Sequence, residues 1–337
     1  MALFGRPTVH LLLVIACGFL TYSNTFHVPF VFDDDTSIVN NPVIRNLENF
    51  FLNGTGYSYN PRRFIGYLSV ALNYRLGGLD VTGYHIFNLG VHITTACLVY
   101  ALVRLTLQTP FLIRNSRSGA LKPLTAGNSE SKTLKFLPLL AALLFVVHPV
   151  QSQAVTYIIQ RLASLATLFY LASLVLYAKG RLFQVSDDPA HGKAVFLYLA
   201  ASAAAALAMQ TKEIAITLTI VVASYEFCFF RMTIKQKVVI LLLTILALSL
   251  AFMALIHTGK PLGELLSDVS RMTRVETDIH RGDYLLTQFS VIVTYIRLLV
   301  LPINQNLDYD YPLNHTLFTM RTFSSLLLLM ALFGLAF

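Results

Sequence analysis

Charged residues are scarce in this sequence, and tryptophan is absent. Only 12% of its 337 residues are Asp, Glu, Lys or Arg, whereas 55% are hydrophobic and the mean hydropathy is +0.64. A typical soluble domain is about 25% charged, so this chain has too little polar surface to cover a globule in water. The composition therefore excludes an ordinary soluble domain and predicts a membrane protein whose excess apolar surface faces lipid.

Other absences limit the chemistry. The three cysteines (Cys17, Cys97 and Cys228) lie inside apolar runs, so we interpret them as small hydrophobic residues that predict no disulfide framework. No glycine-rich nucleotide-binding loop is present. Most of the residues behind the net charge of +8 lie in loops between apolar runs. That placement indicates membrane topology and argues against a nucleic-acid partner.

Eight apolar runs predict membrane-spanning helices, and a ninth is a candidate. A span needs about 20 mostly apolar residues, so the shorter runs are expected to tilt or to continue into polar flanks. The first run is expected to remain as an uncleaved span. The ninth run, 284–301, carries Gln288 and Arg297 and alternatively lies along the interface. The predicted fold is an all-α bundle of about 8–9 transmembrane helices. The eight runs are 8–26, 84–106, 136–150, 157–178, 195–209, 214–230, 238–257 and 322–337.

The distribution of Lys and Arg orients these spans. With the N-terminus in the cytoplasm, the inside segments hold thirteen basic residues against three acids, and the two long outside loops hold eight against ten. Cytoplasmic loops carry the excess of Lys and Arg, so this orientation is the expected one. The inside segments are 1–7, 104–135, 179–193 and 231–237, and the outside loops are 27–83 and 258–283.

The first outside loop contains a stretch, 63–76, that is apolar on one face and carries Arg63, Asn73 and Arg75. This pattern is typical of a helix lying in the plane of the membrane interface. No internal repeat is visible. We expect the whole chain, 1–337, to form a single transmembrane domain.

Polar groups gather on the outside face in this topology. Ionisable groups at membrane depth are costly and indicate function. The groups are Asp33-Asp34-Asp35, Asn60-Pro61-Arg62-Arg63, His148 to Gln153 with Gln160-Arg161, Gln210-Thr211-Lys212-Glu213, and, if its side is assigned correctly, Asp308-Tyr309-Asp310.

The three adjacent carboxylates Asp33, Asp34 and Asp35 repel each other. At least one is therefore expected to have a raised pKa or a cationic partner. A carboxylate tuned in this way can accept a proton from a hydroxyl nucleophile. The alternatives are a solvated acidic loop and a loop that holds a divalent cation through oxygen ligands.

The segment after His148 suggests a polar stripe. Pro149 is expected to begin a helix, and Gln153, Tyr157 and Arg161 recur at helical spacing together with Gln160. The stripe could line a site, or it could be a hydrogen-bonding seam between helices.

Several cations suit a phosphate. Lys212 has a compact ammonium group that Glu213 would orient. Planar guanidinium groups, which can donate two parallel hydrogen bonds to a phosphate, are present on Arg62, Arg63 and Arg161. The alternatives are a surface ion pair for Lys212 and Glu213 and lipid-headgroup binding for the two adjacent arginines.

Taken together, these motifs resemble a known family. The string from Phe30 to Asn41 (FVFDDDTSIVNN) is similar to the "FVFDD…IVNN" segment of the transmembrane O-mannosyltransferases that carry tetratricopeptide repeats, and of their bacterial relatives. Further matches follow in the family's order. They are Asn73-Tyr74, Gly83 to Asn88 with His85 and His92, His148-Pro149-Val150 with Ala154-Val155 and Arg161, Thr211 to Ala215, and Leu301-Pro302 with Asp308 to Tyr311.

The chain also departs from the family pattern. The family usually has Arg-Pro where this chain has Arg62-Arg63, and Gln153 stands where an acid is common. The family's tetratricopeptide repeats are not seen in this sequence.

The resemblance implies a GT-C fold glycosyltransferase with a polyprenyl-phosphate sugar donor and a hydroxyl acceptor on a protein or glycan. It places the base on Asp33 or Asp34, with Asp35 at a variable position, and the leaving phosphate on Arg63, Arg161 and Lys212. Direct displacement would invert the anomeric centre. Supporting roles are expected for Arg62, His85, His148, Gln153, Glu213, Asp308 and Asp310.

The same resemblance favours a bacterial inner membrane with the site facing the periplasm; the alternative is an endoplasmic reticulum membrane with the site facing the lumen. No cofactor beyond the lipid donor is expected, although the aspartate triplet could hold a divalent cation. Two other classes stay open: a transporter or flippase for a lipid-linked or anionic solute, and a non-catalytic membrane scaffold.

Overall fold

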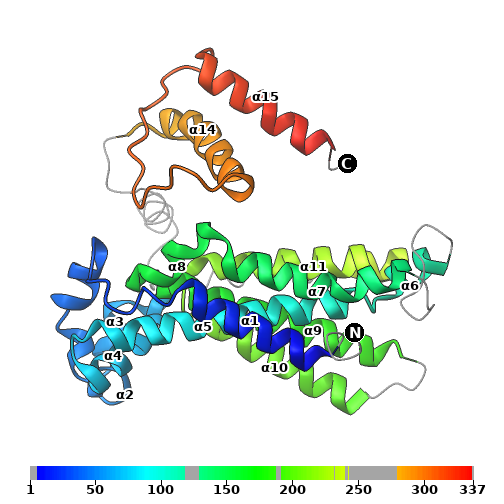
Figure 1. Cartoon of the computed structure of the whole chain (residues 1–337), viewed down its shortest axis with the longest axis horizontal. Helices are drawn as coiled ribbons and strands as arrows, with labels where there is room; N and C mark the ends of the chain where they lie inside the picture. The colour runs from blue at the N-terminus through cyan, green and yellow to red at the C-terminus, as the bar shows by residue number, and fades with distance from the viewer. Residues whose placement is uncertain are drawn as a thin grey trace. The chain divides into compact units, whose positions relative to one another are not determined.

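The computed structural model describes residues 6–117, 129–186, 191–230, 232–239, 242 and 279–335. Regular structure within these ranges is entirely helical, which confirms the all-α class. The chain forms two compact units, Met1–Leu255 and Ile256–Phe337 (Figure 1).

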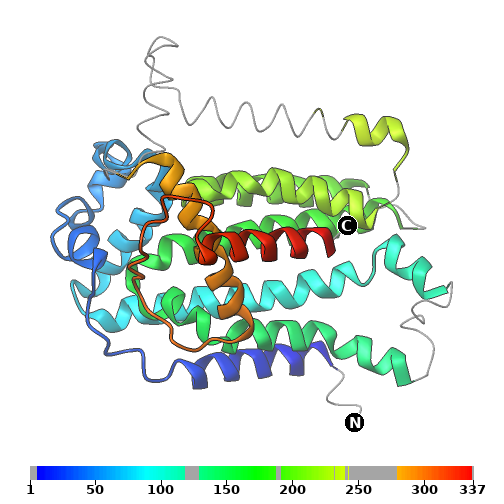
Figure 2. The same cartoon turned by 90° about the horizontal axis from the view of Figure 1, so that it is seen from above.

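Long helices form the body of the first unit and lie side by side in a bundle (Figures 1 and 2). Helix α9 packs against α5 and α10, and α5 also packs against α1 and α7. Gly18 permits the contact between α1 and α5, because a Cβ there would lie 2.7 Å from a side-chain carbon of Ile93. The helices are α1 (Pro7–Thr21), α5 (Val81–Thr106), α7 (Ser129–Val147), α9 (Arg161–Gln184), α10 (His191–Met209) and α11 (Leu218–Phe229).

The described helices include four that are long and apolar enough to cross a membrane, and a fifth if one bent pair is a single span. The four are Val81–Thr106, Ile158–Gln184, His191–Met209 and Arg281–Val300; the bent pair joins Leu134–Val147 to Pro149–Thr156 at 50°. This is an integral membrane protein. Two predicted spans are shorter than expected, since α1 has 15 residues and α11 has 12. The predicted run 238–257 lies mostly outside the described residues, as does the loop 258–283.

The first loop is a compact cap of short helices at one end of the bundle (Figure 1). Its core joins Ile38, Ile44, Tyr67 and Val70 to Ile158 of the body. The helices are η1 (Asp35–Val39), η2 (Val43–Arg45), α2 (Glu48–Phe51), α3 (Thr55–Tyr59), η3 (Pro61–Arg63) and α4 (Phe64–Gly77). Helix α4 confirms the helix predicted over 63–76, and its buried face packs on α5 and α9.

The chain between His148 and Arg161 is not one helix. It consists of η4 (Pro149–Gln151), α8 (Ser152–Thr156) and η5 (Ile158–Gln160), and Tyr157 between the last two has extended backbone angles (φ −79°, ψ 109°). The predicted polar stripe on a single helix is therefore wrong. Pro149 does begin a helical turn, and His148 caps it by accepting a hydrogen bond from the amide of Val150 at 3.2 Å.

The second unit contains α14 (Arg281–Val300) and α15 (Met320–Leu335), which contact each other. The segment between them folds back onto α14. His315 pairs with Asp283 at 2.7 Å, and the amide of Asn314 donates to the Thr287 hydroxyl at 3.0 Å. Helix α14 confirms that the ninth candidate run is helical. The short segment α6 (Pro110–Arg117) lies within the predicted inside loop 104–135.

Candidate active site

Asp34 is a buried anchor of the first loop. Its side chain is fully buried, and its two oxygens accept hydrogen bonds from the amides of Val31 at 3.1 Å and Ile159 at 2.7 Å. Burial raises the pKa of the Asp34 carboxyl above its usual range, while these amides and the nearby His85 act in the opposite direction. Asp34 therefore ties the loop to the broken segment before α9.

Asn88 of α5 supports the other side of this break. Its amide group donates to the carbonyls of Val155 at 3.3 Å and Ile158 at 3.2 Å. Irregular backbone at membrane depth requires partners for groups that a continuous helix would pair internally. Asp34 accepts from a backbone amide and Asn88 donates to backbone carbonyls. These hydrogen bonds explain how the helical backbone can be interrupted at Tyr157.

Arg161 is the centre of the network beneath the loop. It is fully buried, and its guanidinium lies over the Phe87 ring, 4.3 Å from the centroid. Four of its five N–H groups donate to neutral acceptors. These are Asn88 Oδ1 at 2.8 Å, Asn73 Oδ1 at 2.5 Å, the Ser69 carbonyl at 3.2 Å and the Tyr84 carbonyl at 3.0 Å. The arginine thus joins α4, α5 and α9, and little of its fork remains for a ligand.

Asp33 and Asp35 differ from their neighbour because both are exposed. The backbone amide of Asp33 donates to the Tyr157 hydroxyl at 3.0 Å, which fixes this residue against the chain break. Asp35 instead accepts from Asn40 at 3.0 Å within its own turn. The three adjacent carboxylates are thus in three different environments. Only Asp33 combines exposure with a contact to the body of the protein.

Two cations lie close together at the turn after α10. Arg63 Nε is 3.4 Å from Glu213 Oε1, and both side chains are about one-third exposed (39% and 34%). Lys212 is partly buried beside them. Burial and the nearby Arg63 charge lower the pKa of the Lys212 ammonium, and Glu213 partly opposes this shift. Arg63 and Lys212 thus form a pair of partly exposed cations, and the Glu213 carboxylate forms an ion pair with Arg63.

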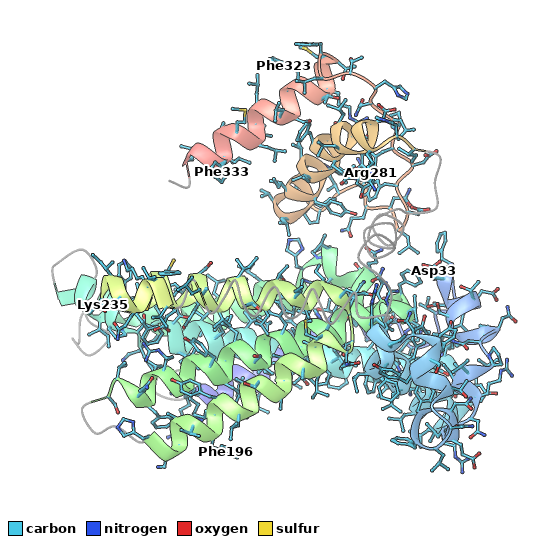
Figure 3. All side chains as sticks on the ribbon, turned by 180° about the vertical axis from the view of Figure 1, so that it is seen from behind. Asp33, Phe196, Lys235, Arg281, Phe323 and Phe333 are labelled. Atoms are coloured by element: carbon cyan, nitrogen blue, oxygen red, sulfur yellow. The ribbon has the colours of Figure 1, made fainter. Side chains whose placement is uncertain are left out.

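A main-chain hydrogen bond joins this turn to the first loop. The amide of Ile65, in the first turn of α4, donates to the carbonyl of Gln210 at 3.0 Å. Further along α4, Ser69 and Asn73 contact Arg161. Hydrogen bonds thus connect the segment around Tyr157 through Asn88, Arg161 and α4 to the turn that carries Lys212. The carboxylate and the cations lie at the same end of the first unit, and Figure 3 shows Asp33 at the opposite end from Lys235.

The other predicted site residues have varied positions. His85 is buried under the loop, where its Nε2 lies 2.8 Å from the Val28 carbonyl and its Nδ1 has no hydrogen-bond partner. His148 caps η4. The Gln153 carbonyl accepts from the Tyr157 amide at 3.2 Å, which closes the C-terminal end of α8, and Arg62 lies in η3. Asp308 and Asp310 are exposed residues of the second unit.

Sequence reasoning missed the roles of Asn88 and Tyr157. Both occur within recognised motifs, but nothing local marks either as a support for a chain break. The divalent-cation alternative for the triplet stays a prediction. Asp34 faces amide donors, and no group of three or more His, Cys, Asp or Glu within the described ranges is placed to hold a metal ion.

The described residues thus define an all-helical integral membrane protein with an exposed carboxylate and paired cations at one end of its bundle. No family model matches the sequence, and no solved structure matches it significantly.

Curated proteins do match. The chain is 33% identical to protein O-mannosyl-transferase Tmtc3 of Drosophila melanogaster over 180 residues, and 31% identical to a protein O-mannosyl-transferase of Caenorhabditis elegans over 182 residues. It is 28% identical to human protein O-mannosyl-transferase TMTC4 over 204 residues. These matches cover 50%, 51% and 56% of this chain, but only 19%, 23% and 25% of the relatives. The chain is therefore similar over half its length to protein O-mannosyl-transferases, as its motifs indicated.

Tyr157→Phe tests the support that holds Asp33. The substitution removes one hydrogen bond, worth about 1 kcal/mol, and leaves the ring in place. If Asp33 takes part in catalysis, kcat is expected to fall about fivefold with little change in the KM for the acceptor. The matched control is Tyr57→Phe, an exposed tyrosine of the same loop. Equal rates in both variants would show that the Tyr157 hydroxyl does not position Asp33.

If Lys212 binds the phosphate of a donor, the affinity is expected to depend on pH. Only its charged form attracts an anion, so affinity is full at low pH and is lost as pH rises through its pKa. Because that pKa is lowered, the loss is expected at a lower pH than for an ordinary lysine. Donor titrations over a pH series should show this loss, and Lys212→Arg should remove it, since arginine stays charged. The same profile in both proteins would assign the pH dependence to another group.

Proposed function

We propose that this chain is a GT-C type membrane glycosyltransferase. It transfers a mannose-like hexose from a polyprenyl phosphate to an extracytoplasmic hydroxyl, most simply that of a protein Ser or Thr. The observation that supports it best is the placement of exposed Asp33 and the Arg63–Lys212 pair at one end of one bundle. The names of the related protein O-mannosyl-transferases support the same chemistry.

In the proposed reaction, the Asp33 carboxylate accepts the proton of the acceptor hydroxyl. The hydroxyl oxygen attacks the anomeric carbon, and the bond from that carbon to the phosphate oxygen breaks. The bonding pair leaves with the polyprenyl phosphate, whose negative charge Lys212 and Arg63 stabilise. Attack opposite the leaving group inverts the anomeric centre.

The buried residues receive supporting roles in this proposal. Asp34 and Arg161 hold the first loop, the chain break and α4 in one arrangement, so that Asp33 is presented to solvent. The sequence suggested that Arg161 contacts the phosphate directly. Because four of its N–H groups already donate hydrogen bonds within the protein, the proposal assigns that contact to Lys212 and Arg63 alone. His85, Glu213, His148 and Gln153 remain supporting residues, and Arg62 contributes positive charge beside Arg63.

The topology belongs to the same proposal. The chain would form one GT-C-like transmembrane domain of about 8–9 helices, including the run 238–257. The site would face the periplasm from a bacterial inner membrane, or the lumen from an endoplasmic reticulum membrane. Asp308 and Asp310 of the second unit keep the supporting role that the resemblance implies for them.

The test uses the whole chain in lipid nanodiscs with radiolabelled polyprenyl-phosphate mannose and a Ser/Thr-rich peptide. Label is expected to enter the peptide, with release of polyprenyl phosphate. Asp33→Asn serves as the inactive control. Label that crosses the membrane of proteoliposomes without entering any acceptor would instead identify a transporter and reject the proposal.

A further inference from the structure

A large cavity lies away from the candidate active site. It has a volume of about 780 Å³ and is walled by α9, α10, α11 and the segment 232–239. That volume is within the range of about 300–1,000 Å³ that ligand sites occupy. Lys235 is among its lining residues, and Figure 3 shows Lys235 at the end of the first unit opposite Asp33. The cavity is therefore separate from the proposed catalytic groups.

The walls are lined largely by small and apolar side chains. On α10 the lining includes Ala201 and Ala205, and on α11 it includes Leu218, Val222 and Ala223. Such short side chains leave space between helices that a longer residue would fill. The lining of α9 runs from Ser173 to Gln184, which is about 16 Å at the helical rise of 1.5 Å per residue. This length is close to the hydrocarbon depth of one leaflet, about 15 Å.

The lining contains a polar cluster near the C-terminal ends of α9 and α11. Arg181 forms a bidentate ion pair with buried Glu226, donating from Nη2 to Oε1 and from Nε to Oε2, and Glu226 also accepts from the Tyr177 hydroxyl at 2.8 Å. Arg181 further donates to Gln184 at 2.7 Å. The cluster is thus internally satisfied, and its two charges cancel. Lys235 is exposed and adds a positive charge, so the charged residues of the lining sum to +1.

We propose that this cavity binds one anionic phospholipid of the cytoplasmic leaflet. An acyl chain lies between α9, α10 and α11, and the headgroup phosphate lies at the Lys235 ammonium. The basic segments place this end of the bundle in the cytoplasm, where anionic lipids attract Lys and Arg. The apolar walls and the polar, positively charged end of the lining match the two parts of such a lipid. The proposal depends on the topology and does not depend on the transferase activity.

Native mass spectrometry of the delipidated whole chain in detergent tests this assignment. The protein is titrated separately with phosphatidylglycerol and phosphatidylcholine. Ala205→Leu fills the cavity, and its expected effect is to weaken phosphatidylglycerol binding on the order of tenfold. Ala203→Leu is the matched control, because Ala203 is exposed on the same helix and does not line the cavity.

A second pair of variants tests the headgroup contact without altering the packing. Lys235→Ala should weaken phosphatidylglycerol binding about fivefold, which corresponds to about 1 kcal/mol per lysine near an anionic lipid, and should remove the preference over phosphatidylcholine. Lys237→Ala should change neither, since Lys237 is exposed and lies outside the lining.

Three results would overturn the proposal. If Ala205→Leu and Ala203→Leu bind phosphatidylglycerol with equal affinity, the lipid binds elsewhere. If the wild type binds phosphatidylglycerol and phosphatidylcholine with equal affinity, the site does not recognise an anionic headgroup. If undecaprenyl phosphate displaces phosphatidylglycerol and binds more tightly, the cavity holds a polyprenyl chain. Each result is obtained without a transfer assay, so it leaves the proposed catalytic function untouched.

Discussion

Asp33→Asn is expected to reduce sugar transfer by about 10²- to 10⁴-fold, the usual contribution of a general base. The amide cannot accept the hydroxyl proton, but the backbone amide of Asp33 can still donate to Tyr157, so the loop should keep its conformation. Donor binding should be unchanged, because the proposed phosphate contacts are Lys212 and Arg63. The measurement is single-turnover transfer in nanodiscs, together with a donor titration.

The neighbouring aspartates are the matched controls. Asp35→Asn alters an equally exposed carboxylate that contacts only its own turn, and should leave the rate within about twofold of the wild type. Asp34→Asn should instead destabilise the protein by about 1–3 kcal/mol, because an amide group would set N–H groups against the donors Val31 and Ile159. If Asp33→Asn behaves like Asp35→Asn, the base is not Asp33.

Arg161→Ala is expected to have the largest effect on stability, a loss on the order of 3–5 kcal/mol. The substitution leaves two asparagine oxygens and two carbonyls without a donor in a buried setting, and it opens a cavity beside Phe87. Thermal unfolding in nanodiscs should show a large drop in the midpoint. Transfer activity measured well below that midpoint should fall as well, because the break at Tyr157 loses its support from α4 and α5.

Two further variants sharpen this result. Arg75→Ala removes an exposed arginine of α4 and should change the midpoint little. Arg161→Lys keeps the charge but cannot reproduce the planar fork, so most of the destabilisation should remain. If Arg161→Ala is as stable as Arg75→Ala and loses only donor affinity, then Arg161 contacts the phosphate directly, and the supporting role proposed for it is wrong.

Features encoded in a few consecutive residues could be predicted from the sequence. Pro149 indicated the start of a helical turn, the polar run around Lys212 indicated a turn between apolar helices, and the apolar face of 63–76 indicated α4. Each depends on local backbone preference or on the hydrophobic period, which short segments carry by themselves. The similarity to O-mannosyltransferases likewise followed from short ordered motifs.

The organisation of the site could not be predicted in this way. The break at Tyr157 is held by Asp34 and Asn88, which are 125 and about 70 positions away from their partners along the chain. Sequence spacing alone favoured a continuous helix there. In the same way, an arginine at the start of an apolar run suggests a ligand contact, and only the packing of α4 and α5 around Arg161 shows that its donors are already occupied.

The bond between the Ile65 amide and the Gln210 carbonyl involves no side chain. Almost any replacement at either position leaves those atoms in place, so point mutation can reshape the surrounding surface while the spacing of the two segments is preserved. Proline at position 65 is the exception, since it has no amide hydrogen to give. The side chains of Arg63 and Lys212 can therefore be varied to bind other anions while the main-chain spacing of the two segments stays fixed.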